Sequence, residues 1–245
     1  MNLKEILSIL NEVAKENKIH TPYIVGGVPR NILLGKFNAL NDVDITTGYD
    51  DVHSLADLFA KKLGLAPRVF EDGHRKVYVE HFQIDFSSHA VSEHLGPKAK
   101  GMSAIEKDAY SRDFTVNALF IPLDFSDIID PTGKGVSDIH ERKLNTPIDS
   151  AQVFRDSPNR IIRAFYYAAK YDLKISDEIK AAIKSNLDLL DTVKGRYSGK
   201  SIAAALREKP ELLDDLIETG VLSHIPLTKD IVDILIKEKK LNKVI

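Results

Sequence analysis

Two carboxylates two residues apart, Asp42 and Asp44, are the residues whose type and spacing most directly suggest chemistry. They stand in the run Asp-Val-Asp-Ile at the start of an apolar stretch, a pattern that predicts a β-strand. Alternate residues of a strand point to the same face, so both carboxylates would project together while Val43 and Ile45 face the core. Paired carboxylates repel each other unless a positive charge lies between them, and Mg²⁺ is commonly held by one or two carboxylates plus substrate phosphates. The pair predicts a metal site, against the plainer interpretation of a turn or a helix cap.

A glycine pair precedes these carboxylates. Gly26 and Gly27 follow a short apolar run, residues 23–25, and lead into a helical pattern over residues 29–34. Glycines at a junction between strand and helix let backbone N–H groups approach an anion, and the helix N-terminus favours negative charge. A Gly-Gly turn alone is common. Followed by the carboxylates, it predicts a phosphate-binding turn that faces a metal-binding pair.

Three stretches resemble the class II (bacterial-type) CCA-adding tRNA nucleotidyltransferases and their relatives, the bacterial poly(A) polymerases. The first is Gly-Gly-x-x-Arg, which ends at Arg30, together with Asp-x-Asp-Ile from Asp42. The second is Arg-Asp-Phe-Thr-x-Asn-Ala-Leu from Arg112, and the third is Val-Phe-Arg-Asp-Ser-Pro-Asn-Arg from Val153. The resemblance implies an α+β fold, in which a nucleotidyltransferase head with a small mixed β-sheet and flanking helices is followed by an all-α neck and partial body.

The expected organisation is a head domain at residues 1–144 and a helical neck and short body at residues 145–245, with no strands in the second part.

A chain of 245 residues with 43% hydrophobic and 29% charged residues has the size and composition of one or two globular domains. With no cysteine, disulfides, thiolate metal sites and a cysteine nucleophile are excluded. The first 19 residues have the spacing of an amphipathic helix and no apolar run has membrane length, so we expect a cytoplasmic protein without a membrane partner.

The resemblance assigns the metal site to three carboxylates. It implies that Asp42, Asp44 and Asp85, the last inside a predicted strand at residues 83–86, hold two Mg²⁺ ions and form the catalytic centre. One ion would lower the pKa of an RNA 3′-hydroxyl, and the other would neutralise the triphosphate and the leaving pyrophosphate. Taken without the resemblance, Asp85 is a polar residue on an exposed strand face.

The nucleotide-binding residues are assigned in the same way. The resemblance implies that the glycine pair and Arg30 cradle the phosphates. Arg112 and Asp113 would hold the ribose and triphosphate, with Asn117 bracing the strand that follows. From the residues alone, Arg112 and Asp113 are also compatible with a simple salt bridge at a helix end.

Base selection is expected from a helix predicted over residues 158–171. The resemblance implies that Asp156 and Arg160 pair with the Watson–Crick edge of the incoming base, and Arg163 lies three residues further on the same helix face. The family places an aspartate where this chain has Ser157, which cannot supply a charged acceptor. The departure leaves the choice of nucleotide open.

These assignments predict transfer of CMP or AMP from CTP or ATP to an RNA 3′ end, namely that of tRNA (CCA addition or repair). A net charge of −2 means that RNA would be bound by a local basic patch. A poly(A) polymerase, or an enzyme that adds only A or only CC, would share every catalytic residue. A nucleotidyltransferase that modifies a protein or a small molecule is the alternative from another class. The resemblance also implies a compact version without most of the body and tail, and the sequence does not determine the oligomeric state.

Overall fold

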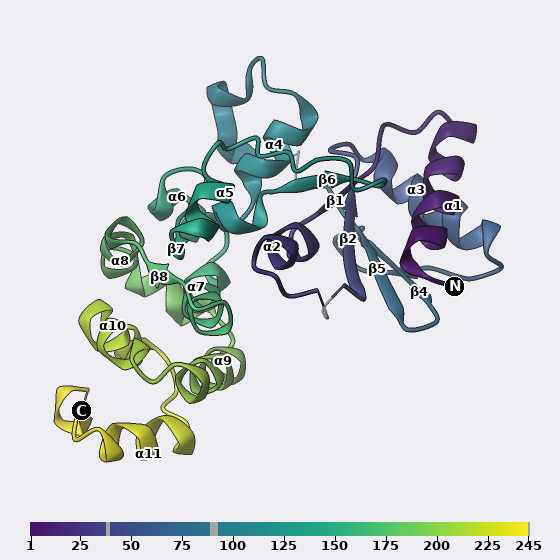
Figure 1. The fold of residues 1–245 in the computed structure, drawn as a ribbon. Coiled ribbons are helices and arrows are strands. Elements are labelled where there is room, and N and C mark those ends of the chain that lie inside the picture. The colour runs from purple at the N-terminus through teal and green to yellow at the C-terminus, as the bar shows by residue number, and fades with distance from the viewer. Residues whose placement is uncertain (38–39, 89–92, 245) are drawn as a thin grey trace. The chain divides into compact units, whose positions relative to one another are not determined.

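The computed structural model describes residues 1–37, 40–88 and 93–244. The chain divides into two compact units, Met1–Ile139 and His140–Ile245, each with buried apolar side chains of its own (Figure 1). Among the helices in these ranges, none combines the length and the apolar character needed to cross a bilayer.

The first unit, within the described ranges, is built on a six-stranded mixed sheet with the order β3-β4-β5-β2-β1-β6. Its strands are β1 (Tyr23–Val25), β2 (Asp42–Thr46), β3 (Arg68–Val69), β4 (Arg75–Val79), β5 (Phe82–Phe86) and β6 (Phe120–Pro122). Strand β2 pairs in parallel with β5 and antiparallel with β1, and the other neighbours pair antiparallel. The strand that carries the paired carboxylates therefore lies inside the sheet.

Helices flank this sheet on both sides. They are α1 (Leu3–Glu16), α2 (Gly27–Leu33), α3 (Asp51–Lys62), α4 (Ala104–Ser111) and α5 (Gly135–His140), with the short 3₁₀ helices η1 (Glu93–Ala99) and η2 (Thr115–Asn117). In Figure 1, α1 and α3 lie together on one side of the sheet and α2 lies on the other. The helix predicted at the N-terminus is confirmed: Asn2 and Glu5 form a capping box at its start, and its apolar face is buried. Phe59 of α3 packs on Phe86 of β5 with ring centroids 5.9 Å apart.

The second unit is mainly helical. It contains α6 (Ser150–Asp156), α7 (Asn159–Lys170), α8 (Asp177–Lys184), α9 (Gly195–Glu208), α10 (Leu212–Thr219), α11 (Lys229–Lys237) and the 3₁₀ helices η3 (Leu187–Thr192), η4 (Val221–His224) and η5 (Leu241–Lys243). The predicted fold class, an α+β head followed by a helical part, is confirmed. The expectation of no further strands was wrong, because β7 (Lys143–Leu144) and β8 (Lys174–Ile175) pair in parallel. Two-residue strands are too short to show an alternating pattern in the sequence.

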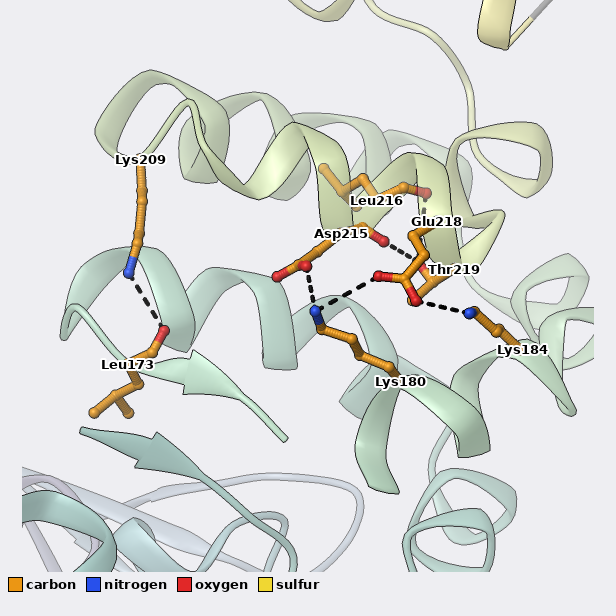
Figure 2. Close-up of polar contacts among 8 residues, drawn as sticks. All are labelled: Leu173, Lys180, Lys184, Lys209, Asp215, Leu216, Glu218 and Thr219. Atoms are coloured by element: carbon orange, nitrogen blue, oxygen red, sulfur yellow. Dashed lines mark hydrogen bonds and ion pairs between the residues drawn. The ribbon is translucent and has the colours of Figure 1, made fainter. Parts of the chain in front are cut away.

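Ion pairs join α8 and α10 in this second unit (Figure 2). The ammonium group of Lys180 contacts Asp215 and lies 3.7 Å from Glu218, which also accepts a hydrogen bond of 2.8 Å from Lys184. Burial lowers the pKa of Lys180, but its hydrogen bond with Asp215 and the nearby carboxylates outweigh burial and leave the pKa raised. Each of the four charged residues that join α8 and α10 therefore has an opposite charge beside it.

Candidate active site

Strand register brings the candidate metal-binding side chains together. Asp44 of β2 lies opposite Asp85 of β5, and Asp42 lies opposite Gln83. Because directly paired residues of adjacent strands point to the same face, the three carboxylates share the face opposite to the buried Val43. The alternation predicted for β2 is thus present.

The glycine pair packs directly against Asp44. Gly26 has a φ of +75°, and a Cβ at this position would lie 2.9 Å from Oδ2 of Asp44 and 3.7 Å from Nη1 of Arg112. The backbone N–H of Gly27 donates a hydrogen bond to Asp44. A side chain at position 26 would strain the backbone and displace the carboxylate at the same time. Glycine is therefore required here by both conformation and space.

Asp44 carries a charge that the surrounding protein only partly compensates. It is half-buried, and the loss of solvation raises its pKa from 3.8 to about 6. Arg112 lowers this pKa, Asp85 and Asp42 raise it, and the hydrogen bond from Gly27 lowers it slightly. The balance favours a site that gains when a cation binds.

Asp85 has a different environment, because both of its oxygens already receive N–H donors. Nζ of Lys76 lies 3.1 Å from Oδ1, and Nε2 of Gln83 donates to Oδ2 at 2.9 Å. The same amide group also donates to Oδ1 of Asp42 at 2.7 Å. Burial raises the pKa of Asp85, and although Lys76 and Gln83 lower it, the pKa stays above its ordinary value.

A residue that the sequence interpretation missed, Asp108 of α4, ties Arg112 to the carboxylate strand. It is fully buried, and its Oδ1 accepts a hydrogen bond of 2.8 Å from Nε of Arg112. Its Oδ2 accepts a hydrogen bond of 2.7 Å from Thr46, two residues after Asp44 on β2. The available signal was the spacing of four residues between Asp108 and Arg112, which is that of an intrahelical ion pair. In the described part of the chain, Nη2 of Arg112 is buried without a hydrogen-bond partner.

Asn117 links two other predicted nucleotide-binding residues. Its Nδ2 donates to Oδ1 of Asp113 at 2.9 Å, and its Oδ1 accepts a hydrogen bond from Nη1 of Arg30. All three side chains are buried. Asn117 ends the 3₁₀ turn η2 and does not lie in a strand, because β6 begins only at Phe120. Through these two hydrogen bonds, Asn117 joins α2 to the residues that follow α4.

The residues expected to select the base all lie in the second unit. Asp156 is the last residue of α6, and Arg160 donates a hydrogen bond of 3.4 Å to a backbone carbonyl of that helix. Nη2 of Arg163 donates to the hydroxyl group of Tyr167 at 3.0 Å. Asp156, Arg160 and Arg163 thus belong to the α6–α7 segment, and the other predicted site residues belong to the first unit.

Of the three predicted metal ligands, Asp42 and Asp44 are suited to hold Mg²⁺ in the arrangement that the structure shows. Within residues 1–37, 40–88 and 93–244, no group of three or more histidines or carboxylates is arranged to hold a metal ion. Asp42 and Asp44 still fit Mg²⁺, since that ion commonly takes one or two carboxylates and completes its shell with water and phosphate oxygens. The raised pKa of Asp44 points the same way, because burial raises it and Arg112 offsets that effect only in part.

The fold and this site together define a nucleotidyltransferase-like head, and comparison with known proteins gives the family. The model of the Poly A polymerase head domain matches residues 22–145, half of the chain. The chain belongs to this family, as the three sequence stretches predicted.

Individual relatives are enzymes that act on tRNA. The CC-adding tRNA nucleotidyltransferase of Geobacter sulfurreducens is 33% identical over 175 residues, which cover 71% of this chain and 37% of the relative. The CCA-adding enzyme of Geobacillus kaustophilus is 26% identical over 237 residues, 91% of this chain and 54% of the relative. A tRNA-processing enzyme solved with CTP has 28% identity and a TM-score of 0.71 over 89% of this chain and 58% of that one. The chain spans about half, or less, of the length of the curated relatives.

Proposed function

We propose that this chain carries the catalytic head of an RNA nucleotidyltransferase that transfers CMP or AMP from CTP or ATP to the 3′ end of tRNA. The observation that carries the proposal is the contact of Asp44 with the glycine pair and its proximity to Arg112, on a head that belongs to the family. The CTP-bound neighbour and the tRNA-modifying relatives supply the substrate class.

In this proposal Asp42 and Asp44 hold Mg²⁺, and Asp85 completes the site. Bound there, Mg²⁺ would lower the pKa of the RNA 3′-hydroxyl and neutralise the triphosphate and the leaving pyrophosphate, with two ions in the full mechanism. The protein contributes the fixed direction of the carboxylates, which β2 and β5 hold by their pairing in the sheet.

The nucleotide would be held by the residues around Arg112. Its buried Nη2, without a partner in the described ranges, is placed to donate to a phosphate or ribose oxygen, and Asp108 fixes the direction of the guanidinium group. Asp113 would accept from the ribose, because Asn117 and the backbone hold its carboxylate in place. Gly26, Gly27 and Arg30, at the start of α2, would cradle the phosphates.

Asp156 and Arg160 would read the base, and Arg163 of the same helix would contribute to nucleotide binding. The proposal places the head at residues 1–144 and the neck and short body at 145–245, in a cytoplasmic protein whose partners are tRNA and nucleoside triphosphates. A carboxylate and a guanidinium group can present donors and acceptors in the pattern of a complementary base edge.

An extension assay tests the proposal. The protein, Mg²⁺ and each labelled nucleoside triphosphate are incubated with tRNAs that end before CCA, after C and after CC. We expect stepwise addition of two C and one A, abolished in Asp42→Ala and Asp44→Ala. Asp57→Ala serves as the matched control, because Asp57 is half-exposed and pairs with Arg75. Failure to extend any of the three tRNAs would refute the proposal.

Partial addition is the second candidate. The observations that favour it are Ser157 at the position of a base-selecting aspartate and the CC-adding relative at 33% identity. Addition that stops after two C, or addition of A alone, would assign the chain to this candidate, and long A tails would assign it to a poly(A) polymerase. Ser157→Asp is then expected to change the nucleotide preference.

A further inference from the structure

A row of four charged residues crosses the sheet beside the proposed metal site. Strand register places Asp44 opposite Asp85, Asp85 opposite Lys76, and Lys76 opposite Arg68. Directly paired residues point to the same face, so the row runs from two carboxylates to two cations on one surface. Lys76 is therefore held next to Asp85 by the backbone and not by a chance side-chain conformation.

We infer that Lys76 competes with a divalent cation for the carboxylate of Asp85, and so weakens metal binding at the site formed with Asp42 and Asp44. The inference rests on the proposed function, because that function places a metal ion at this site. Lys76 then acts as a positioning residue, since it alters the site through Asp85.

The first support is the occupancy of the Asp85 oxygens. Nζ of Lys76 lies 3.1 Å from Oδ1 and Nε2 of Gln83 donates to Oδ2 at 2.9 Å, so a cation that approaches either oxygen meets an N–H donor already bound there. Gln83 is neutral and can turn its amide oxygen toward a cation, whereas an ammonium group has donors only and repels the cation. Lys76 is therefore the partner that opposes metal binding.

The second support is the low exposure of the pair. The side chains of Lys76 and Asp85 are 18% and 14% exposed, so water screens their attraction less than at an open surface. The ammonium group also lies 6.0 Å from the ring centroid of Phe70, which gives it a favourable place on this face. The contact is therefore strong enough to affect a ligand that needs the same oxygen.

The test is Mn²⁺ binding without nucleotide or RNA, followed by the electron paramagnetic resonance signal of free Mn²⁺ in titrations of the full chain. Lys76→Met is expected to bind Mn²⁺ about tenfold more tightly than the wild type, since an adjacent cation changes the proton affinity of a carboxylate by about one to three powers of ten. Lys76→Arg keeps the charge and should stay near the wild-type affinity. Arg75→Met is the matched control, because Arg75 is the neighbouring cation but pairs with Asp57 of α3.

A double-mutant cycle with Asp85→Asn separates competition from general charge repulsion. If Lys76 acts through Asp85, then Lys76→Met in the Asp85→Asn background changes the affinity by about twofold or less. An equal tightening in both backgrounds would overturn the inference, and so would an unchanged affinity in Lys76→Met or the absence of Mn²⁺ binding in every folded variant. Circular dichroism establishes that each variant is folded. Nucleotide incorporation plays no part in this test, so its outcome is distinct from that of the extension assay.

Discussion

Two clusters of acidic residues in this chain have opposite electrostatic settings. On the sheet of the first unit, burial and mutual repulsion raise the pKa values of Asp44 and Asp85. Between α8 and α10 of the second unit, Lys184 and Lys180 lower the pKa of Glu218, and the carboxylates raise that of Lys180. The second cluster is compensated within the protein, and the first is compensated only in part.

The difference separates a stabilising cluster from a binding one. Charges that are paired inside the protein need no further ligand, whereas carboxylates that stay charged against desolvation favour a cation from outside. Proximity of acidic residues alone does not distinguish the two cases. The two cases differ in how far neighbouring cations compensate the charge of the carboxylates.

The largest expected effect concerns catalysis. Asp44→Ala should reduce nucleotide incorporation by about a thousandfold or more, because a proposed metal ligand that acts with others as a unit is lost. Asp215→Asn, the change in the compensated cluster, should leave the rate per folded molecule within about twofold. Single-turnover extension assays at 25 °C measure both. Comparable losses in the two variants would remove the functional distinction between the clusters.

The next effect concerns the buried link behind the carboxylate strand. Asp108→Ala should lower the free energy of unfolding by about 3 to 5 kcal/mol, because it leaves Arg112 buried without its partner. Thr46→Val removes one hydrogen bond to the same carboxylate and one that the Thr46 hydroxyl accepts from the backbone N–H of Gly48, and should cost about 2 kcal/mol. Urea denaturation measures both changes. A loss below about 1 kcal/mol in Asp108→Ala would show that the link is not structural.

The pH dependence of stability should also differ between the clusters. The folded-state pKa of Asp44 is about 6 against 3.8 unfolded, so the folded chain binds more protons between these values and loses stability as the pH rises through 6. Asp44→Asn removes this loss, and at about 1.4 kcal/mol per pKa unit its advantage over the wild type should grow from near zero at pH 4 to at most about 3 kcal/mol at pH 8.

Urea denaturation in EDTA across this pH range provides the measurement. Asp215→Asn is the control, and it should show no such gain at high pH. An Asp44→Asn variant that is less stable than the wild type at pH 8 would contradict the interpretation of Asp44 as uncompensated.

The smallest expected effect lies in the second unit. Lys180→Met should lower the free energy of unfolding by about 1 kcal/mol, because Lys180 pairs with carboxylates that remain partly solvated. The loss should shrink in high salt, which screens such pairs. Thermal unfolding at low and high ionic strength measures it. Increased stability in Lys180→Met would mean that desolvation dominates in this cluster too.

The sequence predicted the parts of the fold that depend on local pattern. The alternation in Asp-Val-Asp-Ile gave the strand and the face of Asp42 and Asp44, and the resemblance gave the family. The contact of Asp85 with Lys76 could not be predicted, because it depends on the register between β4 and β5, whereas Gln83 lies two residues before Asp85 on the same strand. Asn117 was expected to brace the strand that follows, but its side chain bonds to Asp113 and Arg30, contacts between separate segments that no local pattern shows.

The interior position of β2 has a consequence for the dynamics of the chain. Its amide protons are held from both sides, by β1 and by a parallel partner some forty residues later in the chain. Local opening cannot release such a strand, so its hydrogen exchange should require unfolding of the whole first unit. The two-residue edge strand β3, exposed along its length, should exchange through local fraying instead. The carboxylate pair therefore forms only when long-range pairing is complete, and a partly folded chain should not bind metal at this site.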